Sequence, residues 1–119
     1  MSDYLHLSQY DSWISLSLDA GNSQVFAIGE KMESACPEAY MNGYNWDAFF
    51  RYYLEKNDPD ILEDMDSDPE ADTYEVHWPL SPENEARAKR FEEIVRALLE
   101  NEAELCRIVR DEGDEIEWD

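Results

Sequence analysis

The sequence is poor in glycine and in positive charge. Only four of its 119 residues are glycine, which leaves little material for loops that wrap around a phosphate or a nucleotide cofactor. Nine Lys and Arg residues stand against 30 Asp and Glu, so the net charge is -21. Because each phosphate contact needs a Lys or Arg, direct binding to nucleic acid or to an anionic membrane is disfavoured. The natural complement of such a chain is a basic protein.

Long apolar runs and paired cysteines are also missing. No stretch approaches the ~18 apolar residues of a membrane span, and the first residues, MSDYLHLSQYDSW, lack the basic start and apolar stretch of a secretion signal. We therefore expect the chain to stay in the cytosol without membrane contact. Cys36 and Cys106 show no local metal or redox spacing, so both are expected to be reduced, buried thiols.

The apolar residues that are present suffice for one core. They make up 43% of the chain, and aromatic residues make up 13%. A chain of 119 residues can bury about two thirds of its unfolded surface around a single core. We expect one domain over residues 1–119.

Period-two alternation of apolar and polar residues predicts several half-buried strands. These segments lie at 5–7, 14–18, 74–78 and 115–118. The turn residues DAGNS at 19–23 should fold the segment 24–28 back as the second strand of a hairpin.

Helical spacing and capping residues predict the helices. They are expected from Gly29 to Pro37, over 46–57, over 59–62 and, after Pro82, in a long segment interrupted at Asn101 and Glu102. The expected N-caps are Asn45, Asp58 and Ser81. An aromatic loop is expected over residues 37–45, and Gly113 should end the last helix in a left-handed conformation.

The order of these elements predicts an α+β fold. Strands come first, and helices punctuated by single strands follow. This order is typical of a two-layer sandwich in which helices pack on one face of a mainly antiparallel sheet.

One acidic stretch, DMDSDPEADTYE at 64–75, has the ligand spacing of a calcium-binding EF-hand loop. The acids at the first, third, fifth, ninth and twelfth positions are Asp64, Asp66, Asp68, Asp72 and Glu75. Position six must turn sharply and needs glycine, but Pro69 stands there, and a strand pattern follows in place of a helix. We predict no metal site, and calcium binding is the least favoured of the functions considered.

Residues that carry catalysis show no recognisable arrangement. His6 and His77 lie far apart and outside any metal or triad motif. The serines of WISLSLD lack the glycines of a nucleophile elbow. We therefore predict that the chain is not an enzyme and uses no cofactor.

The acids are concentrated in two blocks. Residues 55–75 contain ten acids, and residues 100–119 contain nine. Such a block is often only a solvated face, but tyrosines and tryptophans flank the first block, and acids mixed with aromatic residues suit an interface with a basic protein. The candidate partner-binding residues are Tyr44, Trp46, Asp58, Asp60, Glu63, Asp64, Asp66, Asp68, Glu70 and Asp72.

These same regions resemble a known family. The stretch AYMNGYNWDAFFRYYLEKNDPDILEDMDSDPEADTY, a long acidic helix and the ending IVRDEGDEIEWD are similar to the immunity protein 51 family of bacterial polymorphic toxin systems. The resemblance runs from about Gly29 to Asp119, and MNGYNW and GDEIEW are its most specific pieces. It implies a small cytosolic α+β antidote that binds and neutralises a toxin encoded beside it, and it supplies no site residues.

Charge and resemblance together favour inhibition by binding. Many toxins delivered between bacteria are nucleases with basic clefts, and an acidic protein could occupy such a cleft in place of phosphate. An alternative that the sequence leaves open is a nucleic-acid mimic that inhibits a basic DNA-binding protein.

Overall fold

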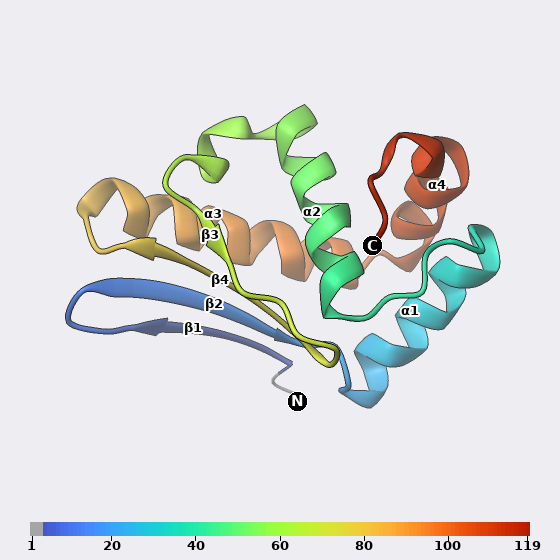
Figure 1. Cartoon of the computed structure of the whole chain (residues 1–119), viewed down its shortest axis with the longest axis horizontal. Coiled ribbons are helices and arrows are strands. Elements are labelled where there is room, and N and C mark those ends of the chain that lie inside the picture. The colour runs from blue at the N-terminus through green and yellow to red at the C-terminus, as the bar shows by residue number, and fades with distance from the viewer. Residues whose placement is uncertain (1–3) are drawn as a thin grey trace.

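The structure, a computed structural model that describes residues 4–119, is built around a four-stranded antiparallel sheet (Figure 1). The strands are β1 (Leu5–Gln9), β2 (Trp13–Asp19), β3 (Asp66–Ser67) and β4 (Thr73–Pro79). Their order is β1-β2-β4-β3, with every neighbouring pair antiparallel. The N-terminal hairpin therefore forms one edge, and the short strand within the first acidic block forms the other.

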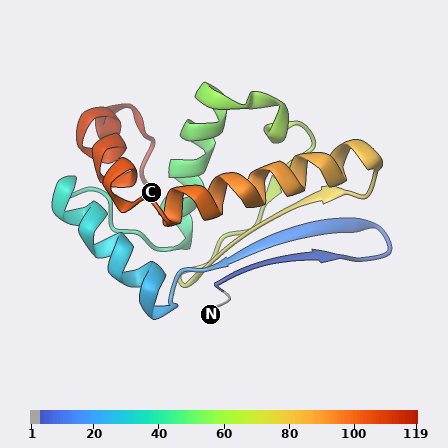
Figure 2. The same cartoon turned by 180° about the vertical axis from the view of Figure 1, so that it is seen from behind.

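Alternation along the strands separates a buried face from an open face. On the buried face, Leu16 of β2 lies opposite Leu7 of β1 and Val76 of β4. The polar residues between them, such as Ser17 and His77, project from the opposite face. Figure 2 shows that the helices lie on one side of the sheet or beyond its end, so the polar face stays open.

Two helices, α2 (Gly43–Asn57) and α3 (Pro82–Leu99), cover the buried face. Phe50 of α2 stacks on Tyr74 of β4 with ring centroids 5.6 Å apart, and it meets Phe91 of α3 edge-on at 5.3 Å. This aromatic core joins both helices to the sheet. The prediction of an α+β fold with helices on one face of an antiparallel sheet is confirmed.

The other helices pack beyond the end of the sheet. α1 (Ser23–Ala35) and α4 (Glu102–Glu112) lie side by side in both views and are joined by an ion pair, Lys31 to Glu102 at 2.9 Å (Figures 1 and 2). Two short 3-10 helices, η1 (Pro59–Leu62) and η2 (Gly113–Glu115), follow α2 and α4. Across residues 4–119, every helix is too short or too polar to cross a membrane.

Several local signals are confirmed. The Ser81 hydroxyl caps α3 by accepting a hydrogen bond from the Asn84 amide, with Pro82 in the first turn. The predicted interruption near Asn101 is where the chain leaves α3 and α4 begins. Both cysteines are free thiols, and Cys36 is buried as expected, whereas Cys106 is only partly buried.

The predicted strand at 24–28 is wrong, because this segment is the first part of α1. The turn at 19–23 does form, but Asn22 then caps a helix by accepting a hydrogen bond from the Gln24 amide at 2.9 Å. The segment buries Val25 and Ile28 and leaves Phe26 exposed, so it follows the helical period and not the strand period.

Three further local predictions are also wrong. α2 begins at Gly43 with Asn42 as its N-cap, so Asn45 lies inside the first turn. Gly113 has a φ of -58° and not a left-handed conformation. A Cβ at Gly113 would lie 2.8 Å from the Cys36 sulfur, so a larger residue there would require the Cys36 side chain to shift. Residues 115–118 form no strand within the described chain and instead fold back as a tail.

Close contact also explains glycine at the start of α2. A Cβ on Gly43 would overlap the carbonyl oxygens of Glu70, in the segment that joins β3 to β4, and of Thr73, the first residue of β4. The Gly43 amide donates to the Ala71 carbonyl at 3.1 Å, which satisfies one of the free donors at the helix start. This contact docks α2 onto the sheet edge.

Gly43→Ala should therefore lower the free energy of unfolding by about 3 kcal/mol, because two backbone segments must move apart. Gly21→Ala is the matched control, since a Cβ there meets its nearest atom at 3.5 Å. The control should change stability by less than about 0.5 kcal/mol in urea denaturation. Equal losses for the two variants would contradict the proposed close contact.

Candidate partner-binding surface

The first part of the acidic block after α2 is tied to α3. Arg90 forms ion pairs with Asp58 at 3.2 Å and with Asp60 at 2.7 Å, and Arg87 reaches Asp60 at 3.2 Å. Hydrogen bonds from Arg87 and, to a smaller extent, from Arg90 hold the pKa of Asp60 below its usual range. These two carboxylates are already partnered, so they are weaker candidates for contact with another protein than the acids that follow.

The remaining candidate acids of this block are exposed. They are Glu63, Asp64, Asp66, Asp68, Glu70 and Asp72. Within residues 4–119, no Lys or Arg side chain forms an ion pair with any of these six. Their charge is therefore available to a partner.

The few cations are almost all used inside the molecule. Across the described chain, every Lys and Arg except Lys89 forms an ion pair with Asp or Glu. Several of these pairs join distant segments, such as Lys56 of α2 to Glu112 of α4 at 2.8 Å. The surplus of carboxylates is consequently left on the surface.

The two aromatic candidates differ in their exposure to solvent. Tyr44 is 41% exposed at the start of α2 and can contact a partner. Trp46 is 0% exposed and stacks on Phe50 with ring centroids 5.7 Å apart. The expectation that Trp46 anchors a partner is therefore corrected, because its side chain belongs to the core.

The stretch with calcium-loop spacing does not wrap around a central point. Asp66 and Ser67 pair with His77 and Val76 as strand β3, and Glu70 forms a bridge with Thr73. Residues 66–70 thus lie along β4 as an extended edge, and residues 73–75 are part of β4 itself. Within residues 4–119, no group of three or more His, Cys, Asp or Glu side chains is placed to hold a metal ion.

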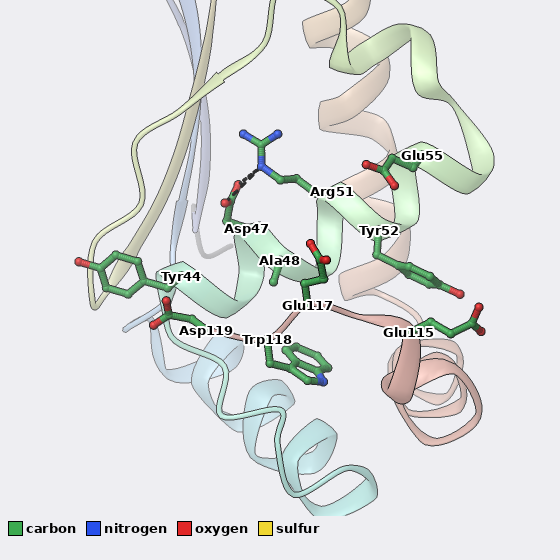
Figure 3. Close-up of a pocket in the computed structure, with 10 residues that line it drawn as sticks. All are labelled: Tyr44, Asp47, Ala48, Arg51, Tyr52, Glu55, Glu115, Glu117, Trp118 and Asp119. Carbon is green, nitrogen blue, oxygen red and sulfur yellow. Dashed lines mark hydrogen bonds and ion pairs between the residues drawn. The ribbon is translucent and has the colours of Figure 1, made fainter.

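A pocket of about 590 Å³ lies between α2 and the C-terminal tail. Figure 3 shows the tail crossing beside α2, with Glu117 pointing from the tail toward the helix. Five carboxylates and one guanidinium line the pocket, together with three aromatic rings and Ala48. The charged lining residues are Asp47, Arg51, Glu55, Glu115, Glu117 and Asp119, and the aromatic ones are Tyr44, Tyr52 and Trp118.

Buried polar contacts hold the tail in place. Asn45 of α2 is buried, and its side-chain oxygen accepts a hydrogen bond from the Asp119 amide at 2.7 Å. The Trp118 indole donates to the Gly113 carbonyl at 3.1 Å, and Ile116 is buried in the core. The carboxylates of the tail are therefore presented from a fixed backbone.

A second network fixes the α2 side of the pocket. The Tyr52 hydroxyl donates to Glu112, which also receives Lys56 at 2.8 Å. The hydrogen bond to the Glu112 carboxylate raises the pKa of Tyr52. In turn, hydrogen bonds from Lys56 and, to a smaller extent, from Tyr52 lower the pKa of Glu112. Lys56 is paired in this network and does not line the pocket, and among the described residues that do, Arg51 is the only Lys or Arg.

The lining suits a positively charged group. Arg51 already pairs with Asp47 at 3.3 Å, which leaves four lining carboxylates without a pocket cation. Carboxylates attract Lys and Arg, and exposed aromatic faces add cation–π attraction. The pocket can therefore accept basic side chains of another protein.

Most of the chain matches a known family. A family model for immunity protein 51 matches residues 5–114. The chain belongs to the immunity protein 51 family. No curated protein and no solved structure matches the chain.

The extent of the match differs from the resemblance expected from the sequence. It begins at Leu5, so it includes the N-terminal strands, and it ends at Asp114, within the GDEIEW motif. The pocket of this immunity protein therefore joins a family-matched helix, α2, to tail residues 115–119 that lie outside the match.

Sequence reasoning missed this pocket. The sequence does show the second acidic block and Trp118, but no local pattern predicts that Asp119 lies against Asn45. Of the candidate residues, only Tyr44 lines the pocket. Arg51 connects the pocket to the first acidic block, because it lines the pocket and also donates to the Ser67 hydroxyl of β3 at 2.6 Å.

Glu112→Gln should lower the pKa of Tyr52 toward its ordinary value of 10.0, because the charged acceptor of the phenol hydrogen bond is removed. Glu115→Gln should lower it less, since Glu115 acts only through its charge. An NMR titration of the tyrosine rings measures both shifts. A Tyr52 pKa that responds equally to the two variants would contradict the network.

Proposed function

We propose that this immunity protein neutralises a cognate toxin by binding to it in the cytosol, without turnover of any substrate. The observation that carries the proposal is the family match over residues 5–114. Members of an immunity family protect the cell that makes the matching toxin, and a bound antidote needs no catalytic groups of its own.

The distribution of charge supports a basic toxin surface as the target. The exposed acids of residues 63–72 and the pocket beside α2 carry carboxylates that internal cations do not neutralise. Attraction between opposite fields can raise association to about 10⁸ to 10⁹ M⁻¹s⁻¹ at low salt. Fast capture suits an antidote that must act before the toxin reaches its substrate.

A nuclease is the toxin class that fits this surface best. A nuclease holds its polyanionic substrate in a basic cleft, and an acidic protein can occupy the same cleft in place of phosphate groups. Affinity would still depend on a few well-packed anchors. Tyr44, exposed at the rim of the pocket, is the anchor that we favour.

Co-expression tests the proposed function. The chain is produced together with the toxin domain encoded by the adjacent gene, and growth and copurification are measured. Rescue of growth with a stable complex is the expected result. A chain that neither rescues growth nor copurifies with that domain does not have this function.

The pocket makes a separate prediction. Glu115→Gln with Glu117→Gln should slow association with the toxin about tenfold, because two carboxylates of the pocket are lost. Glu30→Gln with Glu33→Gln is the matched control, since it removes the same charge from exposed positions on α1. Stopped-flow measurements compare the two variants. Equal slowing would show that only total charge matters and would remove the pocket from the interface.

A further inference from the structure

A second hollow, of about 490 Å³, lies away from the α2 pocket. It contains side chains from the open face of the sheet and from the segment that leads into β3. Both apolar and acidic groups line it. The lining residues that matter here are Trp13, Asp64, Met65, Asp66, His77 and Pro79.

Trp13 is the aromatic surface of this hollow. It begins β2 and is 47% exposed, and the neighbouring Tyr10 is 52% exposed. Tyr10 packs beside it with ring centroids 5.5 Å apart, and the Tyr10 amide donates to the Trp13 carbonyl at 2.8 Å. The hairpin therefore holds the indole in place while part of its face stays open.

Two carboxylates stand at the same hollow. Asp64 has a φ of 62°, the only positive φ of a non-glycine residue within 4–119. Its carboxylate accepts a hydrogen bond from the side-chain amide of the buried Asn84 at 3.4 Å. The Asp66 side chain is 79% exposed and lies 3.5 Å from His77 Nε2. Neither carboxylate has a Lys or Arg ion-pair partner in the described chain.

An unused polar group lies on the same face. Ser15 is opposite His77 in the β2–β4 register and shares the face of Trp13. It is only 4% exposed, and its hydroxyl has no hydrogen-bond partner within residues 4–119. Ser15 and His77 form no Ser–His hydrogen bond of the kind that activates a nucleophile within residues 4–119.

We propose that this hollow receives an arginine side chain of the toxin. The planar guanidinium can stack on the Trp13 indole while it donates hydrogen bonds to Asp66 and Asp64. Its aliphatic stem can lie on Met65 and Pro79. Arginine suits the hollow better than lysine, because only a planar fork can stack and bind carboxylates together. This identification of the partner rests on the proposed function.

The chemistry of the hollow is tested without the toxin. N-acetyl-arginine amide is titrated into the labelled full chain, and the Trp13 indole NH is followed by NMR. A saturable shift is expected, and the neutral isostere N-acetyl-citrulline amide should give none. Asp64→Asn with Asp66→Asn should weaken arginine binding at least fivefold. A citrulline shift equal to that of arginine, or an unaffected double variant, overturns the arginine site.

The toxin arm uses exposed aromatic residues as a matched pair. Trp13→Ala should weaken the complex with the adjacent-gene toxin domain at least tenfold, and Phe26→Ala, which removes a ring that is 50% exposed on α1, should change it less than twofold. Unchanged affinity for Trp13→Ala alongside a stable wild-type complex refutes the docking site alone. Absence of any wild-type complex instead refutes the proposed function, and the arginine titration then still decides the chemistry of the hollow.

Discussion

The packing of Phe50 against aromatic side chains of α2, β4 and α3 determines where the acidic surface lies. Phe50 stacks on Trp46 and Tyr74 and meets Phe91 edge-on, so one side chain connects α2, β4 and α3. Such aromatic pairs contribute about 0.5–1.5 kcal/mol each beyond the area that they bury. Because this face of α2 is fixed against the sheet, the row of Asp47, Arg51 and Glu55 on another face lines the pocket.

A net charge of -21 should destabilise a compact chain through self-repulsion. The structure limits this cost by placing its few cations where they join distant segments, as Lys31 does for α1 and α4 and Arg90 does for η1 and α3. The remaining carboxylates stay together on the surface instead of being neutralised in place. In the proposed function, that unfavourable field becomes favourable when a basic toxin surface covers it.

Local patterns predict much of the fold. The strand at 14–18, the Ser81 cap and the interruption at Asn101 depend on neighbouring residues, and all three are confirmed. The strand predicted at 24–28 failed because a short apolar run suits both periods, and the Asn22 cap decided in favour of the helix.

The surface was harder to predict than the fold. The six acids proposed for the surface between residues 63 and 72 are exposed. The sequence could not show that Arg87 and Arg90 form ion pairs with Asp58 and Asp60. The burial of Trp46 and the pocket beside α2 depend on contacts between segments far apart in the chain. The hydrogen bond from the Asp119 amide to the Asn45 side chain is the clearest example, because it joins the two sides of the pocket from positions far apart in the sequence.

In the proposed function, an unneutralised acidic surface captures a basic toxin. The most direct test of this capture is the rate of association between this immunity protein and the adjacent-gene toxin domain as a function of salt. Electrostatic attraction extends about 30 Å at 0.01 M ionic strength and about 8 Å at 0.15 M. The association rate should fall steeply over this range while the dissociation rate changes little. An association rate that is independent of salt would contradict this mechanism of capture.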